Sequence, residues 1–321
     1  MEDGIITEIR KRNLLHTNID LDGFLSTALI TKAFPETKYK VVGFNSSNDK
    51  IYYLKDKSLI KIDDLIYVDY YVIRGNNRQF VCLDQHVIDF IDINNDPLIF
   101  NPNRDFGITQ ETFTQKFPYS TFIYLLYSFE KNNIVFNDID LNCVIKNEMT
   151  LLDLIYRGDG ILRCFNMYTS NAIDWIERMK KDLPENSLCK KIFDMLYIDG
   201  TNLIDVETRF ANIESTLKDN YSTTTTHNEG YVAINDGMFS LMSDIYKIFN
   251  IPINFGKKSE YKQEIILPYT CSEKRYFNRI INDDNIINFV FTNYERLNFQ
   301  TTKQNKEYFE KTYGRNIKLR K

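Results

Sequence analysis

Two of the chain's three histidines, His16 and His86, lie among aspartate and amide side chains in the N-terminal part of the chain. The run HTNIDLDG contains His16, Asn18, Asp20 and Asp22, and an isolated Asp69 follows in LIYVDYY. A neutral imidazole and several carboxylates are ligands that suit a hard or borderline divalent cation such as Mn²⁺ or Mg²⁺. The pattern therefore predicts a metal-dependent enzyme.

Asp20 and Asp22 are separated by one residue, so both carboxylates face one side of an extended or turning backbone. Two carboxylates so close repel each other unless cations lie between them. A pair of metal ions about 3.5–4 Å apart would remove that repulsion and could act on water and a phosphate together. Asp69 is the residue expected to bridge them. The alternative is structural, with DLDG as a surface turn and Asp69 as a helix N-cap, both frequent roles of Asp.

These residues are expected at strand ends in an α/β domain. Short segments rich in Val, Ile, Tyr and Phe, with a helical pattern after the first, are typical of a buried parallel sheet. The expected strands are NLL, KYKVVGFN, LIYVDYYV and RQFVCLDQHV. Ligands of open parallel sheets bind outside the carboxyl ends of the strands. Asp69, Asp84 and His86 follow such strands and the His16 cluster follows NLL, so three strand ends should converge on one site.

The chain is long enough for two domains, each with its own core. We expect an N-terminal parallel-sheet catalytic domain over residues 1–170, a helical connector and linker over 171–225, and a smaller C-terminal α/β domain over 226–321. The polar run YSTTTTHNEG (221–230) is the expected linker, because it cannot bury a core. PYSTFIYLLYSFE, with Ser120 near its start, and NEMTLLDLIYRGDG are expected helices. In the last part GYVAIND, QEIILPY and INFVFTN are expected strands and SLMSDIYKIFN a helix.

Bulk composition limits the classes of partner. A net charge of −4 and a pI near 5.6 argue against long duplex DNA, whose binding depends on many Lys and Arg contacts to phosphates. The five cysteines are widely spread and never form CxxC, so neither a disulfide framework nor a zinc ribbon is predicted. No apolar run of about 18 residues or signal sequence is found, so we expect a soluble, cytoplasmic protein that does not bind a membrane. A homodimer is compatible with this composition.

The clusters resemble the motifs of the DHH phosphoesterase superfamily, including its RecJ-like and nano-RNase-like members. HTNIDLDG is similar to the family's first motif (His-x-Asn-x-Asp-x-Asp), VD at Asp69 to the second, and LDQH to the Asp-His-His signature. The lone Asp of a fourth motif is best matched by Asp159 in LIYRGDG, with Asp153 as the alternative. The resemblance covers roughly residues 14–160, and GYVAINDGMFSLMSDIYKIF is similar to the start of a DHH-associated domain.

The resemblance implies a site for two Mn²⁺ ions, with Mg²⁺ as the alternative. One ion would be held by His16, Asp20 and Asp69, and the other by Asp22, Asp69, Gln85 and Asp159. Asp69, Asp84 and His86 would be the catalytic residues, with His86 touching the substrate phosphate.

Three further side chains are candidates for substrate binding. They are Asn18, Arg104 and Arg157. Arginine suits bidentate recognition of phosphate. Each arginine stands close to an aspartate in the sequence, so a structural ion pair is the alternative in both cases.

The sequence departs from the family at two places. Gln85 stands where the family has the first histidine of its signature, and an amide is a weaker ligand for Mn²⁺ than imidazole. Either the second ion binds less tightly, or Gln85 only hydrogen-bonds a coordinated water, or catalysis has been lost. The C-terminal part also lacks the glycine-rich GGGH stretch with which relatives grip a phosphate or terminal nucleotide. The candidates left for that task are Lys257, Lys258, Lys274 and Arg275.

The leading hypothesis is a metal-dependent phosphoesterase that hydrolyses phosphodiester bonds of a nucleotide or short oligonucleotide by a two-metal mechanism. The alternative, supported by Gln85, is a DHH-fold protein of weakened catalysis that binds a nucleotide or a partner. Hydrolysis of pyrophosphate or polyphosphate on the same fold is a third hypothesis, with no diagnostic basic motif in its favour.

Overall fold

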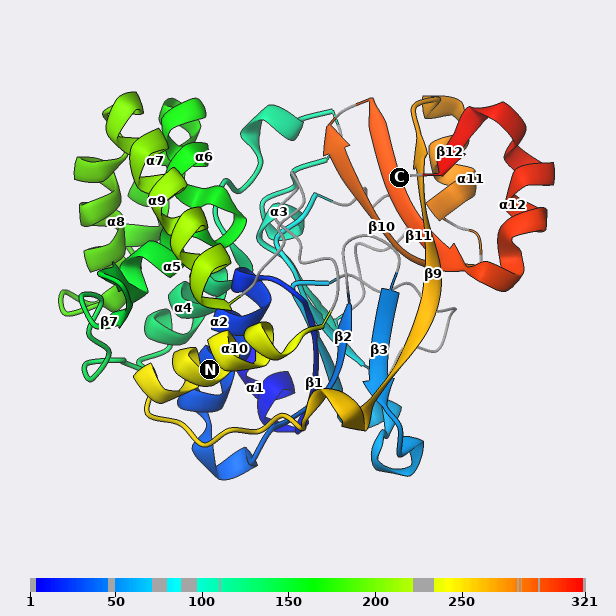
Figure 1. Cartoon of the computed structure of the whole chain (residues 1–321). Coiled ribbons are helices and arrows are strands. Elements are labelled where there is room, and N and C mark those ends of the chain that lie inside the picture. The colour runs from blue at the N-terminus through cyan, green and yellow to red at the C-terminus, as the bar shows by residue number, and fades with distance from the viewer. Residues whose placement is uncertain are drawn as a thin grey trace.

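The computed structural model describes residues 4–45, 50–70, 80–87, 97–109, 111–221, 234–281, 283, 285–293 and 295–319. These residues form an α/β structure in which a large mixed sheet carries helices, as expected (Figure 1). Strands follow the order β10-β11-β9-β3-β2-β1-β4-β5-β6 in this sheet, and β12 pairs with β9. Their bounds are β1 Leu14–Asn18, β2 Lys40–Asn45, β3 Lys50–Leu54, β4 Leu65–Val68, β5 Val81–Leu83, β6 Ile99–Phe100, β9 Tyr261–Cys271, β10 Ile286–Asn293, β11 Arg296–Thr302 and β12 Ile317–Leu319. A separate hairpin joins β7 Val144–Lys146 to β8 Met149–Thr150.

The strands β2, β1, β4, β5 and β6 are parallel, which confirms the parallel sheet expected for the N-terminal part. Their residues are almost all buried, because parallel strands are covered on both faces. The next strand in the chain, β2, pairs with one edge of β1, and the later strand β4 pairs with its other edge. In open α/β sheets this reversal of strand order leaves a crevice at the carboxyl ends of the strands.

Helices cover this sheet and extend from it as a second layer (Figure 1). The helix that follows β1, α2 (Leu21–Ala33), is buried on all sides from Leu21 to Thr31 because β1, α4, α5 and α10 pack around it. The other helices are α1 Gly4–Arg10, α3 Pro102–Asp105, α4 Thr121–Lys131, α5 Leu151–Arg157, α6 Ile161–Met167, α7 Thr169–Lys180, α8 Leu188–Asp199, α9 Leu203–Tyr221, α10 Asp236–Ile248, α11 Phe277–Ile281 and α12 Lys306–Tyr313. The helical character expected for the connector is confirmed by α7, α8 and α9.

The long strand β9 joins the N-terminal and C-terminal strands into one sheet (Figure 1). Its first half pairs with β3 and its second half with β11 and β12. The helix α10, expected at the start of the C-terminal domain, packs against α2 and α9. The described parts of the two expected domains are therefore in extensive contact through β9 and α10.

Local differences from the expected elements concern mainly the strand ends. The strand that begins with NLL continues to Asn18, so His16 lies inside β1 rather than after it. Ser120 caps α4 through its side chain, as its position suggested. The expected strand GYVAIND lies largely outside the described residues, and its described Ile234 and Asn235 are not in a strand. Residues 222–230 of the expected linker also lie outside the described residues.

Two expectations from composition can be compared with the structure. The five cysteines, which all lie in the described part of the chain, are not joined in disulfides, and Cys82, Cys189 and Cys271 among them are buried. Over the described part of the chain, every helix is too short or too polar to cross a bilayer.

Candidate metal centre

The first carboxylates of the site come from the start of α2, directly after β1. Asp20 is the N-cap of this helix, and its side chain accepts a hydrogen bond from the Gly23 amide at 2.8 Å. A Cβ atom at Gly23 would lie 2.4 Å from Thr17 Oγ1 and 2.6 Å from the Asn18 carbonyl oxygen, so only glycine allows the helix to start this close to the strand. The structural alternative had DLDG as a surface turn and the N-cap role at Asp69; instead Asp20 caps α2, and the cap places it at the carboxyl edge of the sheet.

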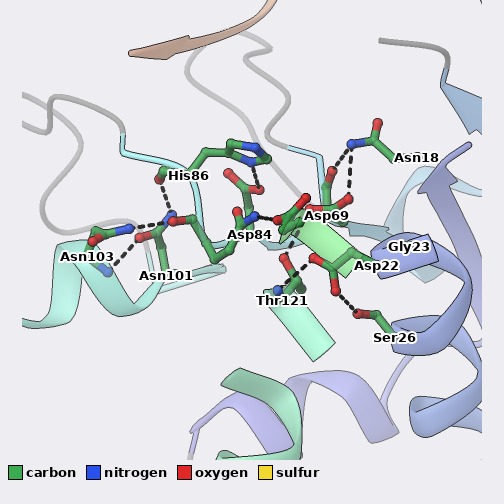
Figure 2. Close-up of polar contacts among 12 residues, drawn as sticks. Asn18, Asp22, Gly23, Ser26, Asp69, Asp84, His86, Asn101, Asn103 and Thr121 are labelled. Atoms are coloured by element: carbon green, nitrogen blue, oxygen red, sulfur yellow. Dashed lines mark hydrogen bonds and ion pairs between the residues drawn. The ribbon is translucent and has the colours of Figure 1, made fainter. Parts of the chain in front are cut away.

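Asp22 lies within the first turn of α2 and its carboxylate faces the N-terminus of α4 (Figure 2). Its two oxygens accept hydrogen bonds from the Thr121 amide at 2.7 Å and the Phe122 amide at 2.8 Å. The first amides of a helix have no partner within the helix, and they favour a negative charge. Asp22 thus joins α2 to α4. The two residues of the first of these bonds, Asp22 and Thr121, are 99 residues apart in the sequence.

Asp69 follows β4 and is 1% exposed. Its backbone is in the left-handed region, with φ 55°. The Asn18 side-chain amide donates to the Asp69 main-chain oxygen at 2.5 Å and to Oδ2 at 3.2 Å, and the Thr121 hydroxyl donates to Oδ1 at 3.2 Å. Both carboxylate oxygens of Asp69 are therefore oriented by neighbours from β1 and α4.

The LDQH segment follows β5, and two asparagines from the start of α3 hold its backbone (Figure 2). The Asn101 amide donates to the His86 carbonyl oxygen at 2.8 Å, and the Asn103 amide donates to the Gln85 carbonyl oxygen. Asp84 Oδ1 lies 2.8 Å from His86 Nδ1. This hydrogen bond orients the imidazole ring through Nδ1. The second ring nitrogen, Nε2, takes no part in it.

Asp159 lies in the turn between α5 and α6, where both Asp159 and Gly160 have positive φ. Aspartate tolerates this left-handed conformation better than most residues. The Gln85 side-chain amide donates to Asp159 Oδ2. Asp159, which the fourth-motif resemblance favoured, therefore reaches the site, whereas Asp153 forms the capping box of α5 and an ion pair with Arg209.

Within the described residues, two groups of side chains offer ligand atoms that all lie within 4.8 Å of one another. One group is Asp22, Asp69 and Asp159, and the other is Asp69, Asp84 and His86. Asp69 belongs to both. Four chain segments that are distant in sequence thus meet at one carboxylate.

Burial and mutual repulsion act strongly on these carboxyl groups. Burial, and then the charges of Asp20, Asp22, Asp159 and Asp84, raise the pKa of Asp69 well above its usual value. Burial also raises the pKa of Asp22, and burial together with the Asp22 charge raises the pKa of Asp20 to about 7. Side-chain hydrogen bonds join Asp69 to Asp20 and to Asp22. A hydrogen bond between two carboxyl groups needs a proton on one of them.

His86 experiences opposing influences. Partial desolvation of the ring, whose side chain is 40% exposed, would lower its pKa, but the adjacent Asp84 carboxylate raises the pKa above the usual value, both through its charge and through the hydrogen bond. The Lys116 ammonium acts in the lowering direction and does not reverse the shift. The net effect favours the protonated form of this imidazole compared with an ordinary histidine.

These residues fit divalent cations. Buried carboxylates that repel one another are stabilised by a positive ion, and oxygen ligands with one imidazole suit Mn²⁺ and Mg²⁺. The Gln85 side-chain oxygen is buried beside this cluster and accepts no hydrogen bond from the described residues. It is one more oxygen that a cation at Asp22, Asp69 and Asp159 could use.

His16, expected as a metal ligand, is in neither group. Its ring is fully buried, with the ring centroids of Tyr67, Tyr53 and Tyr70 at 4.9, 5.2 and 6.1 Å. A Cβ atom at Gly43 on the neighbouring strand would lie 2.3 Å from His16 Nδ1. The structure therefore places His16 in an aromatic layer on the sheet, while Asp84 and His86 form the second group at Asp69 and Asp20 lies at hydrogen-bond distance from Asp69.

The other predicted substrate-binding residues have structural partners. Arg104 pairs with Asp105 at 3.0 Å, and Arg157 is 5% exposed and pairs with Glu214 at 3.2 Å. Asn18 binds Asp69 and accepts a hydrogen bond from Asn45 at 3.1 Å. Asn18 positions the shared carboxylate. Arg104 pairs with the neighbouring aspartate, as in the structural alternative, whereas Arg157 pairs with a glutamate of α9 instead of Asp159.

A pocket of about 180 Å³ opens beside the two groups. Gln85, His86 and Asp159 line it on the side of the site. The remaining lining residues are Val87, Phe113, Lys116, Phe117, Pro118, Tyr119, Cys164 and Phe291. Phe291 comes from β10, whose main-chain amide at this residue donates to the Val87 carbonyl oxygen at 3.0 Å. The pocket thus has walls from both the N-terminal and the C-terminal strands.

Several residues of the site were not singled out from the sequence. Asn101 and Asn103 stand in NPN before a short helix, a pattern that indicates a helix start but not the contacts to Gln85 and His86. Thr121 directly follows Ser120, which was expected near the start of this helix and caps it. No pattern in the neighbouring sequence indicates that Lys116 or Phe291 belongs to the site.

No protein-family model matches this chain, and no curated protein matches it.

Proposed function

We propose that this protein is a metal-dependent phosphoesterase that hydrolyses phosphodiester bonds of nucleotides or short oligonucleotides, with two cations at the carboxylates around Asp69. The observation that carries the proposal is the membership of Asp69 in both groups of ligand atoms. Sites with two metal ions characteristically share a ligand between ions about 3.5–4 Å apart. Mn²⁺ is the cation we propose, with Mg²⁺ as the alternative.

The ligands divide by chemistry. Asp22, Asp69 and Asp159, joined by the Gln85 oxygen, form an all-oxygen set, whereas Asp69, Asp84 and His86 add an imidazole. When bound, the cations would lower the pKa of water and neutralise charge on a phosphoryl group. Asn18 and Thr121 keep the Asp69 carboxylate in one orientation by their hydrogen bonds.

His86 can act as a metal ligand or as a hydrogen-bond donor to phosphate. Which of the two it does depends on whether a cation is bound beside it. As a ligand it must be neutral. Without a cation beside it, the Asp84 carboxylate favours its protonated form, in which Nε2 can donate to a phosphate oxygen. In both cases Asp84 fixes the orientation of the ring.

A second candidate function is binding of a nucleotide or partner without turnover. The observation in its favour is the hydrogen bond from the Gln85 amide to Asp159, which occupies one oxygen of a proposed metal ligand. A cation would have to compete with this bond, which weakens its binding.

The experiment that tests the proposal is hydrolysis of a panel of dinucleotides, cyclic dinucleotides and short RNAs by the full chain with Mn²⁺ or Mg²⁺. We expect phosphodiester cleavage by the wild type and none by Asp69→Asn. Cation and nucleotide binding without cleavage would favour the binding protein. Absence of cation binding would overturn both the metal site and the hydrolysis.

A further inference from the structure

The pocket beside the carboxylates contains a lysine that the family resemblance does not account for. Lys116 lines it together with Gln85, His86 and Asp159. It is the only lysine or arginine in the described lining. Among the described residues, no carboxylate forms an ion pair with it.

The loop that carries Lys116 is held in place by main-chain contacts. The Lys116 carbonyl oxygen accepts a hydrogen bond from the Asn171 side chain at 2.8 Å, and its amide donates to the Phe113 carbonyl oxygen at 3.1 Å. The preceding Gln115 carbonyl oxygen accepts one from the Trp175 indole at 3.1 Å. The backbone is therefore fixed to α7 on one side of the pocket.

The side chain of Lys116 is also placed. Its ammonium lies 4.7 Å from the centroid of the Phe113 ring, a cation–π contact. A positive group in the lining of a small pocket next to the proposed cations offers an anion a favourable site.

The size of the pocket limits the ligand. About 180 Å³ is room for about six water molecules at roughly 30 Å³ each, and it is smaller than the roughly 300 Å³ at which pockets for drug-sized ligands begin. The buried Phe117 and Phe291 close part of it. A phosphate group fits this volume and charge, whereas a whole nucleotide would have to extend out of it.

We infer that Lys116 binds a phosphate group of the substrate in this pocket, adjacent to the proposed cations. The inference rests on the proposed function and specifies it: the pocket takes the phosphate end of a phosphate ester, and the rest of the substrate extends outward. Lys116 supplies a positive group that the sequence did not indicate, in addition to the arginines and the C-terminal lysines considered there.

Binding of inorganic phosphate to the full chain in the presence of Mn²⁺, measured by titration calorimetry, tests this inference. We expect Lys116→Gln to weaken phosphate binding by roughly tenfold or more, the usual loss for a hydrogen bond to a charged group. Lys116→Arg should retain most of the binding. Lys191→Gln, which removes an exposed lysine from α8, is the matched control and should leave it unchanged.

The Mn²⁺ affinity of the same variants separates this inference from the proposed function. Lys116→Gln should bind Mn²⁺ like the wild type and, with a cleaved substrate, should raise KM more than it lowers kcat. Equal phosphate affinity of Lys116→Gln and wild type, with Mn²⁺ bound by both, would overturn the role of Lys116 alone. Wild-type protein that binds neither Mn²⁺ nor phosphate would overturn the proposed function as well.

Discussion

Asn18 and Asp69 are joined by two hydrogen bonds from one side-chain amide, to the Asp69 main-chain oxygen at 2.5 Å and to its carboxylate at 3.2 Å. Asn18 ends β1 and Asp69 follows β4, the strand that pairs with it. The contact therefore locks the position of the shared carboxylate to the register of the two central strands. Because both groups of ligand atoms include Asp69, its removal should affect both cations at once.

Asp69→Asn should abolish the stabilisation of the protein by divalent cations. Asparagine tolerates positive φ and has a similar shape, so the variant should fold. Wild-type protein should gain about 2.7 kcal/mol in free energy of unfolding at a cation concentration 100 times its Kd, and the variant none. Without cations the variant should be at least as stable as the wild type, because one repelling charge has gone. Thermal unfolding with Mn²⁺ and with a chelator measures both effects.

The exposed Asp63→Asn is the control for Asp69→Asn, since it removes the same charge outside the site. It should keep the full response to Mn²⁺. An Asp69→Asn protein stabilised as much as the wild type would contradict the bridging role.

Asp20 should make the stability of the cation-free protein fall as the pH rises from about 4 to about 7. Its folded pKa, about 7, is above the ordinary value of 3.8, so over this range the folded state binds a proton that the unfolded state releases. The free energy of unfolding then decreases with pH. Asp20→Asn keeps the N-cap but cannot titrate, so the wild-type minus variant difference isolates this contribution. Thermal unfolding at several pH values in chelator measures it, and a difference that grows in favour of the wild type toward pH 7 would refute it.

Gln85→His should tighten Mn²⁺ binding more than Mg²⁺ binding. Imidazole is the better ligand for Mn²⁺, whereas Mg²⁺ prefers oxygen. The change also removes the amide that donates to Asp159. Titration of both cations into wild type and variant gives the ratio of their Kd values. A Gln85→Ala variant distinguishes the gain of a ligand from the loss of the bond to Asp159, since only the histidine variant should shift the ratio toward Mn²⁺.

Asp22→Ala should destabilise the protein more than Asp159→Ala does, although both should weaken cation binding. The Asp22 carboxylate accepts the amides of Thr121 and Phe122 in a buried environment. A buried donor without a partner costs about 1–3 kcal/mol, so the loss of both should be evident in chemical denaturation. Asp159 accepts a hydrogen bond from the Gln85 side chain, which can turn to water when that partner is lost. Equal stability of the two variants would show that Asp22 does not anchor α4.

The amino-acid sequence alone indicated the α/β class, the parallel strands and the carboxylates at their ends. These features depend on local patterns, namely runs of buried Val, Ile and Tyr and the polar residues that end them, so they can be read without knowing which segments touch. The same holds for the cap Ser120 before α4. The residues Asp20, Asp22, Asp69 and Asp84 were recognised for this reason.

Only the tertiary structure decided how those side chains are grouped. Asp22 meets the start of α4 across 99 residues, and Gln85 meets Asp159 across 74. The position of His16 also could not be inferred from local sequence. The strand β1 continues through His16, and its side chain lies among the rings of Tyr53, Tyr67 and Tyr70, outside both groups of ligand atoms at Asp69. Lys116 reaches the pocket because α7 holds its loop, a contact that no local pattern records. Residue type and spacing determine which ligands a chain can offer, whereas the packing of distant helices and strands determines which of them share one site.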